Sequence, residues 1–296
     1  MLDRSESTTD AGPLAESIAF FRMTAPLAFL IPSRDRHGDL ARWQPTVQRA
    51  ARRVGAEILV CDQSATPWPG LPGITVLHRP DLGGLPAARN VLLAATTAPL
   101  CCFLDDDTEI AADFAQRLLV QAAAEPAALG WGPVVEVRPV QLRRLFRCVQ
   151  LGALADDRRL AGSRRGRPAA ALFGCAMAFR TAAIRAVGFD ARLPGYALGE
   201  DLDACRRLAA HAGQRRPFRW CSDLRAIHHQ ATTNRTDRWR RGLAKGAFLH
   251  WLARSHGGRN PATALHLGLA LLAASAGRGQ EPAAPLAVWR GAAQSR

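Results

Sequence analysis

The sequence predicts an α/β fold with a mostly parallel central sheet, helices on both faces and a helical extension at its C-terminal end. Short, almost continuously apolar runs are typical of strands buried on both faces, and here they alternate with segments of helical periodicity. The 296 residues allow one large domain or two small ones with a buried core. A hydrophobic fraction of 48% and a charged fraction of 22% exclude wholesale disorder.

The first elements follow the alternation expected of a βαβ unit. Residues 27–31 form an apolar run that Pro32 closes, which indicates a buried strand. Residues 39–54 carry apolar side chains at helical spacing, with arginines on the other face. Residues 57–61 (EILVC) form a second apolar run, and a Pro/Gly-rich loop follows at 64–73.

The alternation continues through the middle of the chain. We expect strands at residues 74–77 and 100–104 (LCCFL), separated by a helix at 84–96. A helix at 111–124 then leads to a strand at 129–137. Parallel strands connected by helices are the result that this order predicts.

The second half is less regular. Residues 138–168 are basic and irregular, which indicates an excursion or a loop. Residues 171–180 resemble another buried strand, 201–212 a short helix and 223–227 a last strand before His228.

These elements divide the chain into a main domain with two extensions. The expected parts are a flexible N-terminal tail at 1–24, the main domain at 25–232 with halves 25–110 and 111–232, amphipathic helices at 233–277 and a flexible tail at 278–296. The apolar stretch 262–277 contains His266 and is shorter than the ~20 residues of a membrane span. Since no early segment has the pattern of a signal peptide, we expect a cytoplasmic protein.

Arginine supplies almost all of the positive charge. The net charge is +14, and Lys245 is the only lysine. This excess fits a phosphate-rich partner, which could be nucleic acid, an anionic membrane surface or a nucleotide; a GC-rich genome that replaces Lys by Arg explains it equally well. The seven cysteines form no C-x-x-C pair, and several lie in apolar runs, so we expect reduced, buried thiols rather than disulfides or structural zinc.

Three acidic residues follow the predicted strand LCCFL directly. Asp105 and Asp107 point the same way in an extended chain, and Asp106 lies between them. Their mutual repulsion falls if a hard divalent cation lies among them, and ligands bind beyond the carboxyl ends of strands in α/β sheets. The alternative is a helix N-cap with a solvated first turn.

Three further groups of residues could carry chemistry. Glu200, Asp201 and Asp203 lie at the start of a predicted helix. Capping does not require three carboxylates, so one of them could serve as a general base. His228 and His229 follow a short strand and could bind a metal, although paired histidines in a loop are more often surface residues. Arg89 could clamp a phosphate, or could be one more exposed arginine.

The order of these motifs adds to their weight. Along the chain come P-S-R-D-R, V-C-D-Q-S, G-G-L-P-A-A-R-N, F-L-D-D-D, F-G-C-A-M-A-F-R, G-E-D-L-D and A-I-H-H. Over residues 26–255 this series resembles the family 2 glycosyltransferases, inverting enzymes with the GT-A fold that use nucleotide-sugar donors.

The resemblance implies a role for each matching position. Asp201 corresponds to the catalytic base, and Asp107 and His228 to metal contacts, with His229 as the fallback. The positions implied to bind the nucleotide-sugar are Pro32, Arg34, Asp62, Arg89, Asp105 and Asp106. Those implied on the acceptor side are Gly174 and Glu200.

The resemblance also implies cofactor and partners. A divalent cation, Mn²⁺ or Mg²⁺, would assist transfer from a UDP-, GDP- or dTDP-sugar to an acceptor hydroxyl, with polysaccharide biosynthesis as a typical setting. The acceptor could be a saccharide, a small molecule or lipid-linked, and basic residues at 238–254 suit peripheral contact with an anionic membrane. Nucleic acid is not expected as a partner. The open alternatives are a metal-dependent phosphoesterase and a non-catalytic basic binding module.

Overall fold

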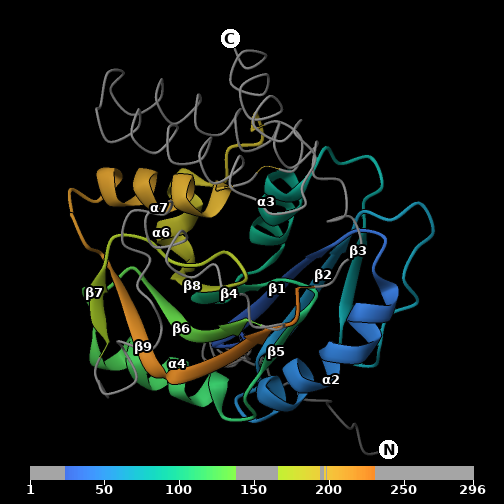
Figure 1. Cartoon of the computed structure of the whole chain (residues 1–296), viewed down its shortest axis with the longest axis horizontal. Helices are drawn as coiled ribbons and strands as arrows, with labels where there is room; N and C mark the ends of the chain where they lie inside the picture. The colour runs from blue at the N-terminus through green and yellow to red at the C-terminus, as the bar shows by residue number, and fades with distance from the viewer. Residues whose placement is uncertain (1–23, 138–165, 194–196, 198, 231–296) are drawn as a thin grey trace, which may run out of the picture.

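The computed structural model describes residues 24–137, 166–193, 197 and 199–230. These residues form a mixed nine-stranded sheet with helices on both faces (Figure 1). Eight strands follow one path, in the order β3-β2-β1-β4-β8-β6-β9-β5, and β7 pairs with β9 beside it.

The first half of the sheet is parallel. It contains β1 (Leu27–Ser33), β2 (Glu57–Asp62), β3 (Thr75–His78) and β4 (Leu100–Leu104). Strand β1 lies between β2 and β4 and is buried along its whole length, as its unbroken apolar run predicts.

The second half is mixed. β8 (Ala176–Arg180) runs antiparallel to both β4 and β6 (Gly130–Val137), and β6 is parallel to β9 (Phe218–His228). Strand β9 therefore runs in the same direction as β4. The three-residue strands β5 (Thr108–Ile110) and β7 (Arg167–Ala169) both pair antiparallel with β9.

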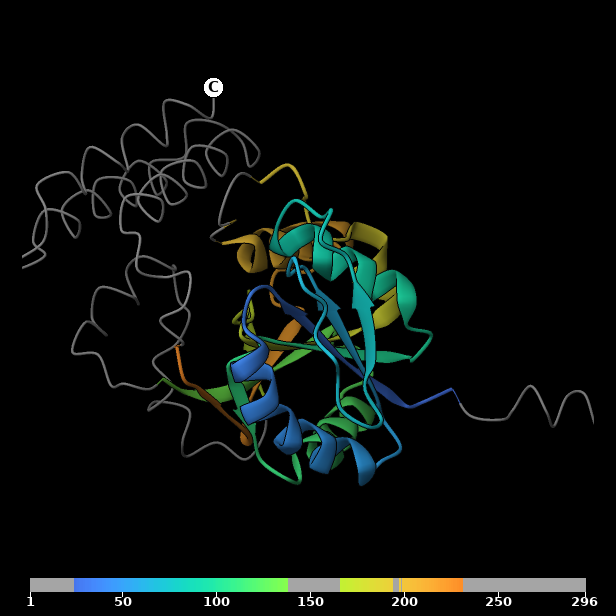
Figure 2. The same ribbon diagram turned by 90° about the vertical axis from the view of Figure 1, so that its right-hand side faces the viewer.

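Helices cover the two faces of the sheet in two groups (Figures 1 and 2). On one face α3 (Leu85–Ala95), α6 (Thr181–Val187) and α7 (Glu200–His211) pack on side chains such as Ala28, Leu30 and Phe103. On the other face α2 (His37–Arg52) and α4 (Phe114–Ala124) pack on Leu27, Phe29 and Ile31. Alternate residues of β1 thus enter opposite cores, as strand geometry requires.

The α/β class and the two helical layers confirm the predicted fold. Three short elements, β5, β7 and α6, were not expected. The segment predicted as a strand at 171–180 is a strand only from Ala176, and β9 begins at Phe218 rather than at residue 223.

Several predictions fall outside the described residues. They concern nearly all of the N-terminal tail, the basic segment up to residue 165, the amphipathic helices and the C-terminal tail. Within the described part of the chain, no helix is long and apolar enough to cross a membrane. Six of the seven cysteines lie in that part, and all six are buried and unpaired, as expected of reduced thiols.

Candidate active site and metal centre

The predicted site residues gather at one edge of the sheet. Strands β1, β2, β4 and β9 run in the same direction, so their carboxyl ends meet there. Ser33, Asp62 and His228 are the last residues of β1, β2 and β9, and the aspartate triplet follows β4 directly. This is the position at which α/β sheets bind their ligands.

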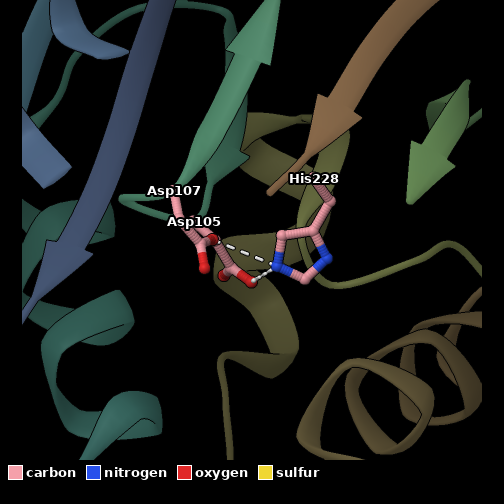
Figure 3. Close-up of side chains that lie close together, drawn as sticks. All are labelled: Asp105, Asp107 and His228. Atoms are coloured by element: carbon pink, nitrogen blue, oxygen red, sulfur yellow. Dashed lines mark ion pairs between the residues drawn. The ribbon is translucent and has the colours of Figure 1, made fainter. Parts of the chain in front are cut away.

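Asp105, Asp107 and His228 form a candidate metal centre (Figure 3). One ligand atom from each lies within 4.8 Å of the others. His228 Nε2 is 3.1 Å from Asp107 Oδ1 and 3.6 Å from Asp105 Oδ2. Two carboxylates and an imidazole fit a divalent cation of the Mg²⁺ or Mn²⁺ type.

The short strand β5 explains how these residues meet. Its pairing with β9 places Thr108 opposite His228, and the backbone N–H of His229 donates to the Asp107 carbonyl at 3.0 Å. On the other side, the Asp105 N–H donates to the Cys175 carbonyl at 3.0 Å. The triplet is therefore fixed between the start of β8 and the end of β9.

Asp106, the middle residue of the triplet, contacts the end of β1. Its carboxylate accepts hydrogen bonds from Ser33 Oγ and Arg36 Nη1, each at 2.8 Å. Burial raises the pKa of Asp106 to about 7, an effect that Arg36 opposes and Asp107 reinforces. Arg36 Nη1 also lies 3.6 Å from Asp107 Oδ2, so one guanidinium offsets the charge of two neighbouring carboxylates.

The residues predicted to line the nucleotide pocket lie at the ends of β1 and β2. Pro32 is buried, and the Arg34 side chain is 60% exposed with its Nε 3.8 Å from Asp35 Oδ2. The buried carboxylate of Asp62 accepts the backbone N–H groups of Ser64 at 3.0 Å and Trp68 at 2.6 Å. These hydrogen bonds fold the loop after β2 back over its end.

Asp62 is held as an anion. Burial raises its pKa, but hydrogen bonds from Ser64 and Trp68 and the nearby His37 outweigh burial and leave the pKa below its usual value. His37 Nε2 lies 3.3 Å from Asp62 Oδ2. The predicted contact between Asp62 and the donor's base stays a prediction.

Asp201 lies at the start of α7, and backbone N–H groups orient both of its carboxylate oxygens. Oδ2 accepts the N–H of Gly174 and Oδ1 that of Leu202, each at 2.8 Å. A Cβ on Gly174 would lie 2.9 Å from Asp201 Oδ2, so only glycine leaves room for this approach. Burial raises the pKa of Asp201, and the charge of Arg89 and the two N–H donors oppose that effect.

Glu200 is more deeply buried than its neighbour. It is 4% exposed and pairs with the Arg89 guanidinium. Burial raises the pKa of Glu200 to about 8, although Arg89 acts in the opposite direction. In this arrangement the Glu200 carboxylate faces Arg89, and the predicted contact between Glu200 and an acceptor stays a prediction.

Arg89 extends from α3 beneath the site. Its Nη2 donates to the Gly174 carbonyl at 2.9 Å and lies 3.4 Å from Asp105 Oδ1, while Nη1 faces Glu200. The residue is 1% exposed. The predicted contact between Arg89 and the donor stays a prediction.

His229, the fallback metal contact, points away from the cluster. Its ring stacks on Trp43 of α2 with centroids 3.7 Å apart and an interplanar angle of 9°. Its Nε2 lies 3.0 Å from Glu109 Oε2. Of the two histidines, His228 is therefore the one placed to bind a metal with the aspartates.

Sequence reasoning did not single out Ser33, Arg36 or Trp43. The motif P-S-R-D-R contains Ser33 and Arg36, but the arginines are spread along the whole chain, so the motif did not distinguish Arg36 from Arg34. Only the register of β1 beside β4 shows that Arg36 reaches the triplet. Trp43 pairs with a histidine that is distant in sequence, which no local pattern reveals.

This fold, with an acidic edge at the carboxyl ends of its strands, is the arrangement that the sequence resemblance implies. Residues 59–188 match the model of the family described as glycosyl transferase family 2. No curated protein matches the chain in a sequence search.

Two solved structures support the fold. The mannosyltransferase PcManGT from Pyrobaculum calidifontis, in complex with GDP-Man and Mn²⁺, is 17% identical with a TM-score of 0.57; the match covers 93% of this chain and 81% of that one. Residues 1–349 of TarS from S. aureus are 11% identical with a TM-score of 0.51, over 82% of this chain and 68% of that one. At such identities the likeness shows the fold alone.

Proposed function

We propose that this enzyme transfers a sugar from a nucleoside-diphosphate sugar to an acceptor hydroxyl, with inversion at the anomeric carbon and the help of Mn²⁺ or Mg²⁺. One observation carries the proposal. Asp105, Asp107 and His228 lie at the same edge of the sheet as Asp201, which comes from a distant part of the chain. The family match and the GT-A fold favour this transfer over a phosphoesterase or a binding module.

The donor side is formed by the ends of β1, β2 and β4. We assign Pro32, Arg34 and Asp62 to the nucleotide, and Asp105 to the ribose and the cation. Asp106 supports them from below through its contacts with Ser33 and Arg36. Asp107 and His228 would hold the divalent ion, which supplies positive charge opposite the leaving diphosphate.

Asp201 is the residue we assign as general base. Two backbone hydrogen bonds orient its carboxylate. The residue is only half-buried and is therefore still accessible. The carboxylate accepts the proton of the acceptor hydroxyl as the oxygen bonds to the anomeric carbon and the bond to the diphosphate breaks. A single displacement from the opposite face inverts the anomeric centre, and no covalent enzyme intermediate forms.

The nucleotide and the metal can be ranked for testing. Since the mannosyltransferase PcManGT, which shares this fold, forms a complex with GDP-Man and Mn²⁺, we propose GDP and Mn²⁺ as the first pair to test, followed by UDP and dTDP. Gly174, beside Asp201, marks the acceptor side of the site.

The test is a transfer assay with Asp201→Asn. Asn keeps the shape of the side chain but cannot take a proton, so we expect turnover to fall by about 10²–10⁴-fold while donor binding stays within about threefold of the wild type. Asp190→Asn is the matched control, because the Asp190 carboxylate pairs with Arg192 and has no role in the proposed step. NMR of the product's anomeric proton checks inversion. Normal turnover by Asp201→Asn would remove the base assignment, and a retained configuration would remove the single displacement.

A further inference from the structure

The position of Arg89 suggests a role other than donor binding. The sequence motif A-A-R-N lies on α3, the helix that begins just after Gly83 and Gly84. A phosphate clamp has to reach the surface of the pocket, but Arg89 is 1% exposed. The side chain lies between α3, β4 and α7, where a guanidinium has to be matched by protein groups.

The contacts of Arg89 reach both halves of the site. Nη2 lies 3.4 Å from Asp105 Oδ1, on the donor side. The same Nη2 donates to the Gly174 carbonyl at 2.9 Å, and Nη1 pairs with Glu200, both on the acceptor side.

Gly174 connects Arg89 to the proposed base. Its carbonyl accepts from Arg89, and its N–H donates to Asp201 Oδ2 at 2.8 Å. The Gly174 backbone lies so close to the Asp201 carboxylate that a Cβ would not fit between them. A shift of Gly174 therefore moves the N–H group that binds Asp201.

Two aromatic rings restrict where the guanidinium can lie. Its central carbon is 5.8 Å from the ring centroid of Phe103 and 5.4 Å from that of Phe189. A planar group packed in this way keeps its fork of donors in one orientation, which the ammonium of lysine cannot reproduce.

We propose that Arg89 is a positioning residue that fixes the proposed base Asp201 relative to Asp105, through Gly174 and Glu200, rather than a ligand of the donor. This inference rests on the proposed function, because it assigns Arg89 a part in the step that Asp201 performs. It predicts that loss of the guanidinium fork reduces turnover and leaves donor binding intact.

The experiment compares Arg89→Lys with the matched control Arg185→Lys. Arg185 is also a structural arginine: its Nη2 donates to the carbonyls of Leu93 at 3.0 Å and Thr96 at 2.7 Å, at the far end of α3. For each variant we would measure kcat, the donor KM and the thermal midpoint. Arg89→Met, which lacks the charge, extends the series if it folds.

We expect Arg89→Lys to lower kcat by about 10–100-fold, with a donor KM within about threefold of the wild type. Arg185→Lys should lose thermal stability without a comparable loss of kcat. The proposal is overturned by a normal kcat in Arg89→Lys, by a raised donor KM at unchanged kcat, or by an equal kcat loss in Arg185→Lys at equal thermal stability.

A second readout is independent of turnover. Amide hydrogen exchange in a peptide containing Gly174 should be faster in Arg89→Lys than in the wild type and unchanged in Arg185→Lys. If the wild type transfers no sugar from any donor, the proposed function fails, and the exchange result alone decides whether Arg89 positions Gly174. Unchanged exchange in Arg89→Lys would count against that role.

Discussion

Gly174 gives the clearest prediction for a single residue. A Cβ at this position would come within 2.9 Å of Asp201 Oδ2 and 3.2 Å of its Cγ. Gly174→Ala should therefore displace the carboxylate and cut turnover by about tenfold or more, since small errors in the placement of reacting groups are costly. The donor KM should change little, because the donor side lies at the ends of other strands.

Gly83→Ala is the matched control for this substitution. A Cβ on Gly83 meets no atom within 4 Å, and its backbone does not lie in the left-handed region. Steady-state kinetics on both variants provide the measurement. Equal turnover in Gly174→Ala and the wild type would show that Asp201 does not depend on this close approach.

Glu200 makes stability depend on pH. Burial raises its pKa from 4.5 to about 8. Between these two pH values Glu200 is therefore protonated in the folded state and ionised in the unfolded state. The contribution of Glu200 to the free energy of unfolding is therefore complete below its unfolded pKa and is lost as pH rises toward 8. We expect the free energy of unfolding of Glu200→Gln to fall less steeply over this pH range.

Urea denaturation of the wild type and Glu200→Gln at about pH 5, 6.5 and 8 tests this dependence. The wild type should lose more stability than the variant over this range. If the two proteins show the same slope, Glu200 does not carry a shifted proton in the folded state.

At the level of elements, the end of β9 separates two neighbouring histidines. His228 faces the aspartates, and His229 stacks on Trp43 of α2. We expect His228→Ala to remove metal-dependent nucleotide binding with little loss of stability. His229→Ala should lower the free energy of unfolding by about 0.5–1.5 kcal/mol, the typical value of an aromatic pair, and keep metal binding.

Calorimetric titration with Mn²⁺ and a nucleoside diphosphate, together with denaturation curves, distinguishes the two histidines. If His229→Ala loses metal-dependent binding and His228→Ala retains it, the assignment of the metal contact is reversed.

The longer elements could be predicted because their apolar runs are unbroken. The run LCCFL matches β4 residue for residue, and β1 and β2 differ from their predicted ends by one or two residues. The first part of β9 was missed because Arg219 interrupts the apolar pattern. Strands β5 and β7 have three residues each and are stabilised by pairing with β9, which a local pattern cannot reveal.

The site also has features that could be predicted from the sequence and features that could not. Strand geometry predicted that Asp105 and Asp107 would point the same way, and the family resemblance implied that Asp107 and His228 would contact a metal. The structure brings the three side chains together. The partners of the buried charges could not be predicted. Arg36 and Arg89 are two of many arginines in a chain of net charge +14, and only the packing of α2 and α3 on the sheet shows which carboxylates they face.

For the whole molecule, the fold brings two acidic stretches that are far apart in sequence to one edge of the sheet. The triplet after β4 and the start of α7 are joined there through Arg89. Such a concentration of carboxylates is stabilised by bound positive charge, which a divalent ion with a nucleoside diphosphate provides.

The most direct measurement is therefore calorimetric titration of GDP and UDP with and without Mn²⁺, on the wild type and on Asp107→Asn. We expect Mn²⁺ to strengthen binding of the preferred nucleotide to the wild type by about tenfold or more, a typical coupling between two ligands. In Asp107→Asn this gain should vanish while metal-free binding stays the same. If Mn²⁺ strengthens binding equally in both proteins, or in neither, Asp107 does not hold a cation for the nucleotide.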